Sequence, residues 1–595
     1  MDVNANPSVA RFRASHDVES KCDHHSSIRR IASPGVDSSV IKNTEQGANG
    51  SVPTYQVTTG APVEKESPLG YEVNWYSIIF LNISQMVGTG VFSTPSSILS
   101  ATGSVGMSLM YWFIGFVISA CSLGTYLELA SYFPSRSGSE TVYLENAYPR
   151  PKWFFPTAFA VQTVILSFSS SNAVVLAQYL FKMADREPTA WEQKGVAVAS
   201  YTVAALFMIA NTRFSLHLSN AIGLIKVLTL VLYALPSPAV VSIAGLVCLG
   251  GNTKVADPMA NFHNAFAGTS SNGYNMANAL VKITFSYSGY QNCFNVMNEI
   301  KDPIKTTRKS APVALLVVAI LYILCNVAYF AAVPAEAILN SEQTVASLFF
   351  SAIFGTRAAR GLNFLVVISA FGNLLAVLIG QSRVIREIGR QGVLPWTPFW
   401  VSTRPFGTPL GPYLLKWAMT VLMILAPPAG DAFNFIVDLQ TYPSAVFFFL
   451  MALGLYFIRR QRSRIGAGRS EFRCWDAAII ITLAVNLFLL IMPWYPPPGG
   501  ATGGDVSFWY GTYCVVGIGI ILFCIFYYWL WIYVLPFFGG YKMRQKVVEL
   551  DDGSVMHQLV RIPNAEVAQW DEEHDAVGNI VGSSGEQSAA QGEKY

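Results

Sequence analysis

Charged side chains are scarce in this sequence. Asp, Glu, Lys and Arg make up 13% of its 595 residues, whereas hydrophobic residues make up 52%, and the mean hydropathy is +0.39. So little charge with so much apolar surface is typical of a polytopic membrane protein and excludes an ordinary soluble globule. The formal net charge of +3 is too small to indicate a nucleic-acid partner.

The sequence also has little that would support catalysis or metal binding. It has 7 histidines, most of them in tails and loops, and no H-E-x-x-H, G-x-S-x-G or P-loop motif. Its 8 cysteines form no C-x-x-C pair, and we interpret them as small buried hydrophobes. The sequence therefore predicts no enzyme, no metal site and no cofactor.

A series of long apolar segments lies between two polar tails. Residues 1–74 predict a disordered tail without a signal peptide, residues 75–536 a domain of transmembrane helices, and residues 537–595 a second polar tail. Twelve segments are candidates for spanning a bilayer. They are residues 75–99, 104–132, 154–183, 194–211, 218–250, 276–298, 311–333, 361–382, 411–427, 433–458, 475–493 and 508–535.

The positive charges of the loops indicate the orientation. Twelve spans return both tails to one side, and the loops on that side carry many more Lys and Arg residues than the opposite loops, for example Arg383, Arg386 and Arg390. By the positive-inside rule, both termini are predicted to be cytoplasmic.

One segment, residues 218–250, is longer than the roughly 20 residues that a span needs. It contains Pro236 and Pro238, which should break a helix. Either the helix bends into an extracellular lip, or part of residues 232–241 is an insertion; we favour an insertion from an unspliced piece of the transcript.

The first apolar segment is interrupted in its middle. Gly88, Thr89 and Gly90 lie within it, where a helix exposed to lipid has poor reason to carry two glycines around a polar residue. One interpretation is a broken helix that turns its free amides and carbonyls toward a ligand. The alternative is close packing against another helix.

The sixth segment repeats this anomaly. Residues 284–292, TFSYSGYQN, place polar and aromatic side chains and a glycine in the middle of the span. Two interrupted segments five helices apart are typical of an inverted repeat of helices 1–5 and 6–10, with a binding site near the middle of the membrane.

These motifs also resemble a known family. GTGVF at residues 88–92 is similar to the helix 1 glycine signature of the amino acid–polyamine–organocation superfamily, and FSYSGY at residues 285–290 resembles its helix 6 counterpart. Further matching stretches include YLELASYFPSRSGSETVYLENAY, NEIKDPIKT and GDAFNFIVDLQTYP. In order and spacing they resemble the L-type amino acid transporters and, within them, the fungal high-affinity methionine permeases.

The resemblance implies a specific architecture and activity. The expected fold is an all-α integral membrane protein of twelve transmembrane helices with a 5+5 inverted-repeat core, in which helices 1 and 6 are broken at mid-membrane. The expected activity is import of neutral L-amino acids, methionine first among them, by proton symport and alternating access at the plasma membrane. A non-transporting amino acid sensor of the same fold is the alternative.

Broken helices suit a zwitterion because backbone amides can face its carboxylate and backbone carbonyls its ammonium. No charged side chain is needed, and residues 85–92 and 284–290 contain none. The resemblance implies that the substrate's carboxylate binds in the region of Thr89, Gly90 and Val91, and that its ammonium binds to nearby backbone carbonyls. The predicted substrate-binding residues are Gln85, Met86, Val87, Gly88, Thr89, Gly90, Val91, Phe285, Ser286, Tyr287, Ser288, Gly289 and Tyr290.

Other residues are expected around the substrate side chain. The Phe285 ring is a candidate gate, or else an ordinary packing aromatic. Apolar and soft walls from Met86, Val87 and Tyr290 would suit a thioether without selecting methionine alone. Secondary pocket candidates are Ser170 and Asn172 of helix 3 and Phe371 and Asn373 of helix 8.

Lys226 is the most informative single charge, because it lies within an otherwise apolar helix. In the resembled superfamily, a helix 5 lysine at this place lies where sodium-driven relatives hold a metal ion. We hypothesise that Lys226 replaces sodium and carries or senses the coupled proton. The alternative is a lysine that reaches the cytoplasmic surface along its own stem.

The remaining charges have more ordinary interpretations. Glu140 and Glu145 are expected to be solvated loop charges, whereas Glu128 and Asp438 are candidates for buried, paired carboxylates. Glu299 is expected in a cytoplasmic ion network.

The expected partners are a small-molecule amino acid, the proton and the lipid bilayer, with no nucleic acid. Heteromeric L-type transporters attach a heavy chain through a cysteine between helices 3 and 4. Residues 182–195 contain no cysteine, so no disulfide-linked heavy chain is expected.

Overall fold

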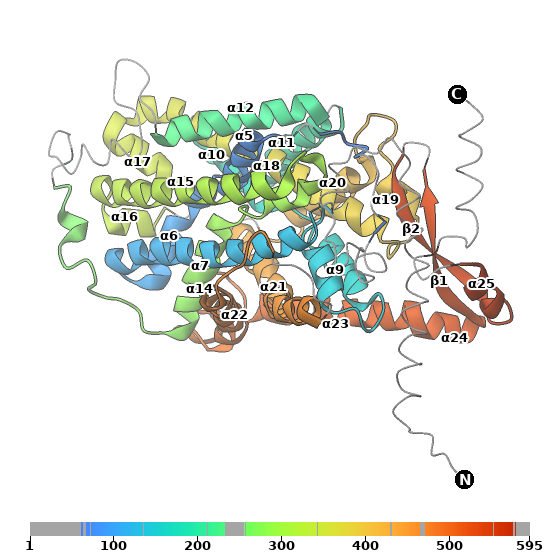
Figure 1. Cartoon of the computed structure of the whole chain (residues 1–595). Helices are drawn as coiled ribbons and strands as arrows, with labels where there is room; N and C mark the ends of the chain where they lie inside the picture. The colour runs from blue at the N-terminus through green and yellow to red at the C-terminus, as the bar shows by residue number, and fades with distance from the viewer. Residues whose placement is uncertain are drawn as a thin grey trace, which may run out of the picture.

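The computed structural model is mostly helical, and its long helices run roughly side by side (Figure 1). It describes residues 61–62, 67–71, 73–134, 136–210, 212–231, 255, 257–341, 343–428, 431–464, 470–550, 553–574 and 578. Residues 1–60 of the predicted N-terminal tail and the predicted insertion at 232–241 therefore lie outside the described residues. The rest of the predicted tail, residues 61–74, is described in part.

The helices and strands follow one another in this order: α5 (Trp75–Met86), α6 (Gly90–Thr102), α7 (Val105–Tyr132), α8 (Glu140–Ala147), α9 (Phe154–Ile165), α10 (Ser170–Met183), α11 (Ala190–Ala210), α12 (Thr212–Val231), α14 (Gly273–Tyr287), α15 (Pro303–Ala332), α16 (Ala335–Leu339), α17 (Val345–Phe354), α18 (Thr356–Arg390), α19 (Thr397–Val401), α20 (Leu410–Leu425), α21 (Ala432–Arg464), α22 (Asp476–Ile491), α23 (Thr512–Trp529), α24 (Leu535–Gly539), β1 (Tyr541–Glu549), β2 (Val555–Pro563) and α25 (Val567–Glu573).

Among the described residues, eight helical stretches are long and apolar enough to cross a membrane. If the bent pair α5 and α6 is counted as one span, there are nine. The three other predicted segments fall on α12, α14 and α20. Of these, α14 has 15 residues and α20 has 16, and α12 is described only to Val231. The chain is thus a multi-pass membrane protein by length and composition of its helices.

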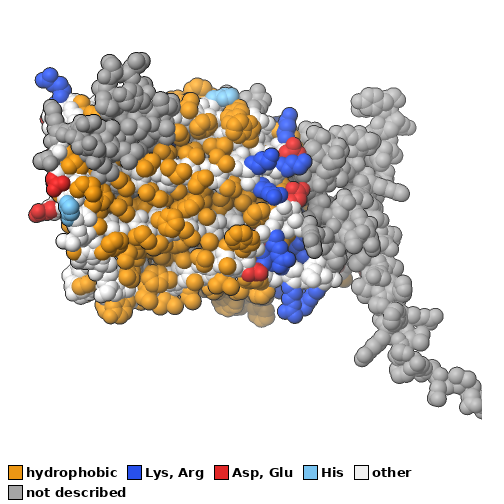
Figure 2. All heavy atoms as spheres, turned by 60° about the vertical axis from the view of Figure 1, so that its left-hand side comes forward, with side chains coloured by type: hydrophobic (Ala, Val, Ile, Leu, Met, Phe, Trp, Pro, Cys, Tyr) orange, Lys and Arg blue, Asp and Glu red, His pale blue; other side chains and the backbone are white. Residues whose placement is uncertain are grey.

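Hydrophobic side chains form a broad apolar belt across the face of the molecule drawn in Figure 2. Large hydrophobic side chains of the membrane helices, such as Phe113, Leu206, Leu422 and Leu522, are half or more exposed. Basic side chains gather along its right-hand margin in Figure 2, with few at the opposite margin. This distribution is that of a surface solvated by lipid and bounded by water.

Two ends of the molecule can be named from Figure 1. The hairpin end carries β1, β2, α19 and α25, and the distal end carries α16 and α17. The cavity and ion pairs described below are placed relative to these two ends.

The bent pair α5 and α6 confirms the interruption that Gly88 and Gly90 predict. The helix axis changes direction by 42° across residues 87–89. Gly90 is needed for close approach, since a Cβ there would lie 2.9 Å from the backbone Cα of Ser286 on α14. The two helices therefore meet at the point where the first one breaks.

The sixth segment is also interrupted. The helix α14 ends at Tyr287, and a 3-10 helix, Asn292–Glu299, follows after four residues. Gly289 in this gap has a φ of 128°, which favours glycine. A Cβ at that position would lie 2.8 Å from the backbone N of Met86.

A further break lies in the third span, between α9 and α10 at residues 166–169. The sequence there is Leu-Ser-Phe-Ser, which contains neither glycine nor proline. Ser167 and Ser169 weaken the helix locally, because serine favours caps and turns over helix interiors, and side chains from other helices hold the free backbone groups of the break, as described below.

The C-terminal region is folded where the sequence analysis predicted only a polar tail. Strands β1 and β2 pair antiparallel, with Tyr541 opposite Pro563. The hairpin packs on the end of α18, where the Nη2 of Arg386 donates to the Ser554 hydroxyl at 3.0 Å and the Nε of Arg390 to the Val555 carbonyl at 2.9 Å. The last membrane helix also continues to Gly539 through α24.

Candidate functional site

The broken first and sixth spans are held together by one tyrosine of α15. The Tyr322 hydroxyl lies 2.9 Å from the Ser286 carbonyl and is also within hydrogen-bond distance of the Met86 carbonyl. The Asn82 side chain adds a second link, since its Nδ2 donates to the Tyr290 carbonyl at 2.8 Å. The carbonyls that end the two half-helices α5 and α14 therefore lie together at one level of the molecule.

Uncharged side chains contact the break between α5 and α6. Ser369 of α18 donates to the Val87 carbonyl at 3.0 Å, and Asn373 on the same helix donates to the Gln85 carbonyl. The Thr89 hydroxyl donates to Oδ1 of Asn172 on α10 at 2.7 Å. None of these contacting side chains carries a formal charge.

A cavity of about 290 Å³ adjoins this break. Among the predicted site residues, its wall contains Gln85, Met86, Gly88, Thr89, Gly90, Phe285, Ser288, Tyr290, Asn172 and Asn373. The other predicted residues do not line it; they are Val87, Val91, Ser286, Tyr287, Gly289, Ser170, Phe371 and Lys226.

Some of these residues have other contacts. The Tyr287 hydroxyl donates to the Trp112 carbonyl of α7 at 3.0 Å. Phe371 meets the ring of Phe207 edge-on, with 6.4 Å between centroids. Both are therefore held by neighbouring helices and not by the cavity.

Two polar atoms beside the break have no hydrogen-bond partner among the described residues. They are Oε1 of Gln85 and Oδ1 of Asn373, and both residues line the cavity. Buried polar atoms usually have a partner, so these two indicate a place where a ligand or water completes the contacts.

The cavity extends toward the hairpin end. Its wall continues from the break to Gln381 and Val384 on α18, to Asn295 and to Glu140. Val384 lies two residues before Arg386, which contacts the hairpin. The cavity thus runs from the middle of the molecule toward one margin of the belt.

Aromatic rings and ion pairs lie on the other side of the break. Phe285 meets Phe433 of α21 edge-on, with 5.8 Å between ring centroids. Lys282 on α14 is fully buried, and its Nζ lies 2.7 Å from Asp438 Oδ1 and 2.9 Å from Asp505 Oδ2. These contacts tie α14 to α21 and to the loop before α23.

Lys226 is buried, with 2% of its surface exposed, so it does not reach the surface along its stem. Its Nζ donates to the Ser84 carbonyl at 2.7 Å, one residue before Gln85. No carboxylate of the described residues pairs with it. The lysine therefore contacts the end of α5 from behind, outside the cavity.

Two further lysines, Lys282 and Lys416, are buried and were not among the residues predicted from the sequence. Lys282 lies two residues before Thr284, and Lys416 lies in α20, on the cavity wall. The signal that singled out Lys226, an ionisable residue in an apolar segment, applies equally to both.

Among the other acidic residues, Glu140 differs from the prediction. It is buried, not solvated, and accepts hydrogen bonds from the hydroxyls of Tyr126 and Ser139. The partners come from α7 and from the turn before α8, which local sequence alone does not bring together. Glu299 is also buried, paired with Arg383 at 2.9 Å.

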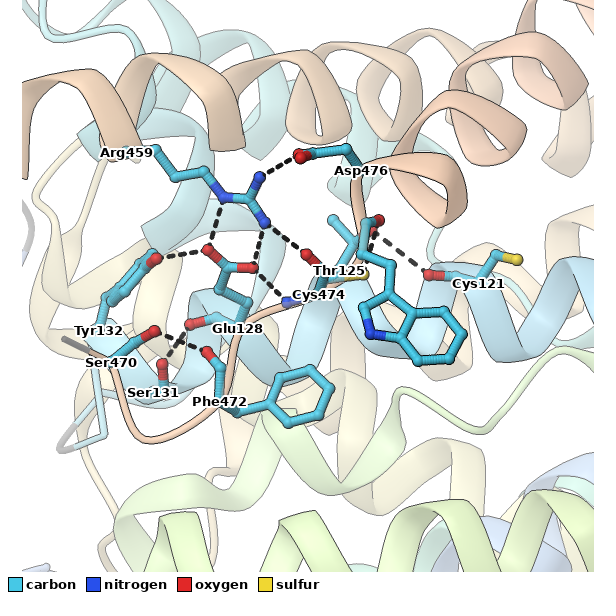
Figure 3. Close-up of polar contacts among 11 residues, drawn as sticks. Cys121, Thr125, Glu128, Ser131, Tyr132, Arg459, Ser470, Phe472, Cys474 and Asp476 are labelled. Carbon is cyan, nitrogen blue, oxygen red and sulfur yellow. Dashed lines mark hydrogen bonds and ion pairs between the residues drawn. The ribbon is translucent and has the colours of Figure 1, made fainter.

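Glu128 is buried and paired, as one interpretation of the sequence held (Figure 3). The Arg459 guanidinium donates to both carboxylate oxygens at 2.7 Å, and the Cys474 amide donates to Oε2 at 2.7 Å. Arg459 also pairs with Asp476 at 2.5 Å. The cluster ties α7, α21 and the start of α22 together away from the cavity, so we interpret it as structural.

Comparison with known proteins decides the family. The sequence profile described as amino acid permease matches residues 73–521, which is most of the chain. The chain belongs to the amino acid permease family. This permease is 34% identical over 510 residues to the high-affinity methionine permease of Saccharomyces cerevisiae, covering 84% of this chain and 86% of that protein.

Other relatives of this amino acid permease are transporters as well. The low-affinity methionine permease of Saccharomyces cerevisiae is 28% identical over 84% of this chain and 89% of its own length. The b(0,+)-type amino acid transporter 1 of Mus musculus is 26% identical over 78% of this chain and 90% of its own length. The predicted resemblance to L-type transporters and methionine permeases is confirmed, and the family is one of permeases rather than enzymes.

Proposed function

We propose that this permease is a secondary active transporter that imports neutral L-amino acids, methionine first among them, by proton symport and alternating access. The observation that carries the proposal is the meeting of two broken helices, α5–α6 and α14, at a cavity where the groups beside the α5–α6 break are backbone and uncharged side chains. The methionine permeases among its relatives support the substrate.

The two charges of the amino acid would meet opposite sides of the break. The amides of Thr89, Gly90 and Val91 begin α6, where free N–H groups and the helix dipole favour a carboxylate. The carbonyls of residues 85–86 and 285–286 end the first half-helices and would accept from the ammonium. The unpartnered Oε1 of Gln85 is a further acceptor at this place.

The substrate side chain would extend between Met86, Tyr290 and Phe285. A thioether and a ring edge attract a large, polarizable side chain, and the walls near the break carry no charge that would exclude one. Phe285, packed edge-on against Phe433, would act as the gate toward the distal end. We assign Val87, Val91, Ser286, Tyr287, Gly289, Ser170 and Phe371 to the layer that shapes this pocket from behind.

Alternating access is supported by the asymmetry of the cavity. It extends toward the hairpin end, whereas Phe285, Phe433 and the Lys282 ion pairs lie toward the distal end. We infer an inward-facing form, in which the substrate would leave toward the hairpin end. The outward-facing form would require the Lys282 contacts to separate.

The topology follows from the same proposal. We propose that α12, α14 and α20 also cross the membrane, giving twelve helices in a 5+5 inverted-repeat core over residues 75–536. The hairpin end, where basic side chains gather, would face the cytoplasm together with both termini, residues 1–74 and 537–595. The plasma membrane is the proposed location, and no disulfide-linked heavy chain is required.

Lys226 is the proposed coupling residue. Its Nζ donates a hydrogen bond to the Ser84 carbonyl near the end of α5. A change in the charge of Lys226 would therefore alter the position of the half-helix whose carbonyls would bind the substrate's ammonium. Movement of a proton on and off this amine would then couple the proton gradient to the break.

Uptake of radiolabelled methionine tests the proposal. The chain, and a version without residues 232–241, would be expressed in permease-deficient yeast in acidic and neutral medium, with and without a proton uncoupler. We expect accumulation that is faster in acid and abolished by the uncoupler. A chain that reaches the surface and binds methionine but never concentrates it would overturn transport and favour the sensor.

A further inference from the structure

The break between α9 and α10 is held by two other helices. The backbone N of Ser169 donates to the Thr420 hydroxyl of α20 at 3.0 Å, and Gln440 Nε2 of α21 donates to the Phe168 carbonyl at 2.7 Å. Lys416 Nζ of α20 donates to the Ser167 carbonyl at 3.2 Å. These tertiary contacts hold the free backbone groups of a break that contains serines but no glycine or proline.

Some N–H groups of the Lys416 ammonium have no acceptor among the described residues. An ammonium carries three N–H groups, and the described residues provide one acceptor, the Ser167 carbonyl. The lysine is 1% exposed, lines the cavity and has no described carboxylate within ion-pair distance. Glu140, the one acidic residue among those that line the cavity, is already bonded to Tyr126 and Ser139.

Ser169 adds a second unpartnered group beside the lysine. Its hydroxyl is buried, lies on the cavity wall and makes no hydrogen bond of good geometry among the described residues, although the buried Tyr201 hydroxyl lies close to it. A buried ammonium without a counter-charge is costly, and a buried hydroxyl without a partner costs less but still destabilises. Both groups therefore favour an incoming oxygen acceptor.

The place of these groups fits the far end of a substrate. Ser169 precedes Asn172 by about one helical turn, roughly 5 Å along the axis. Asn172 accepts from Thr89 in the break between α5 and α6. A side chain of about the length of methionine or glutamate would therefore reach from the zwitterion site toward Lys416 and Ser169.

We propose that Lys416 and Ser169 form a side-chain subsite for amino acids that end in a hydrogen-bond-accepting oxygen, neutral or anionic. The substrate class of this permease then extends beyond thioethers to side chains such as those of methionine sulfoxide and glutamate. The subsite rests on the proposed function, since the substrate must first bind by its zwitterion at the α5–α6 break.

Competition against methionine uptake tests the subsite. Methionine sulfoxide, glutamate and norleucine would each compete with radiolabelled methionine in cells expressing the wild type, Lys416→Met, Lys416→Arg or Ser169→Ala. Because a charge-assisted hydrogen bond is lost, we expect Lys416→Met to weaken competition by both oxygen-bearing compounds by about tenfold and to leave norleucine within about twofold. Lys416→Arg should retain most of the effect, and Ser169→Ala should show a smaller loss of the same kind.

The control is Lys194→Met, which removes a lysine that donates to the carbonyls of Leu425, the last residue of α20, and of Pro427 just after it, outside the cavity. This variant should not change competition by any one of the three compounds selectively.

Wild-type uptake without competition by either oxygen-bearing compound, or equal losses for all three competitors in Lys416→Met and Ser169→Ala, would overturn the subsite. Absence of methionine uptake by surface-expressed wild type would instead overturn the proposed function. If Lys416→Met fails to reach the surface, the wild-type and Ser169→Ala competitions decide.

Discussion

Two helix breaks face the same cavity but are held by different chemistry. The break between α5 and α6 is held by Ser369, Asn373 and Asn172, all uncharged, whereas the break between α9 and α10 is held by Lys416 with Thr420 and Gln440. A ligand that brings both charges is best met by backbone dipoles, because fixed side-chain charges there would be left unpaired when it departs. The fixed charge of Lys416 instead lies at the part of the cavity wall where we propose that the substrate's side chain, which differs between amino acids, would bind.

The largest expected effect comes from filling the first break. In Gly90→Val, the added side chain begins 2.9 Å from the Ser286 Cα, and backbone cannot move aside cheaply. Since α6 and α14 would separate at the substrate's carboxylate site, we expect methionine uptake to fall by about a hundredfold or more. Uptake normalised to surface expression measures this.

Gly361→Ala on α18 serves as its control, because nothing lies within 4 Å of the added Cβ. That variant should transport like the wild type. Normal uptake by Gly90→Val would show that α6 and α14 need not meet for transport.

The next effect distinguishes a paired from an unpaired buried lysine. Lys282→Met leaves Asp438 and Asp505 facing each other without their shared cation, which we expect to cost about 3 to 5 kcal/mol. Lys416→Met removes a charge that has no described carboxylate partner, so it should cost far less. Thermal unfolding of the detergent-purified variants measures both. Equal losses would mean that Lys416 has a structural partner as important as that of Lys282.

A smaller, qualitative effect is expected at Lys226. Lys226→Met removes the contact with the Ser84 carbonyl, and with it the proposed proton carrier. We expect slower uptake that no longer differs between acidic and neutral medium. Initial rates across a pH series test this, and a variant that kept the wild-type pH dependence would remove the coupling role.

The smallest effect is expected at a solvent-exposed pair in the C-terminal region. The Arg544 guanidinium donates two hydrogen bonds to Asp571 and holds the pKa of that carboxyl below its ordinary value. A lowered carboxyl pKa stabilises the fold above the unfolded-state pKa, and the contribution disappears as the pH falls through the folded-state pKa. Because solvent screens the pair, Arg544→Ala should cost less than about 1 kcal/mol at neutral pH and nothing in strong acid. A larger loss in denaturant unfolding would contradict this.

The breaks differ as much in predictability as in chemistry. Gly88 and Gly90 mark the first break because they flank a polar residue in the middle of an apolar segment, and Gly289 marks the second because it lies among polar and aromatic residues in mid-span. Residues 166–169 contain two serines as a weak local signal, and contacts with Lys416, Thr420 and Gln440 from distant parts of the chain hold their break. Local sequence cannot contain that information.

Partnership of buried charges was equally hard to predict. Lys282 and Lys416 could have been found by the rule that found Lys226, but their carboxylate or carbonyl partners lie far away in the chain. The burial of Glu140 depends on hydroxyls of Tyr126 and Ser139, and the β1–β2 hairpin on contacts with α18. In each case the residue type was visible and its partner was not.

The most direct test of the account is an experimental structure with methionine bound. We expect its carboxylate within hydrogen-bond distance of the amides of residues 89–91, its ammonium facing the carbonyls of residues 85–86 and 285–286, and its thioether extending toward Lys416. A methionine whose carboxylate pairs with Lys416 or Lys226, away from the α5–α6 break, would contradict the claim that backbone at the breaks recognises the zwitterion.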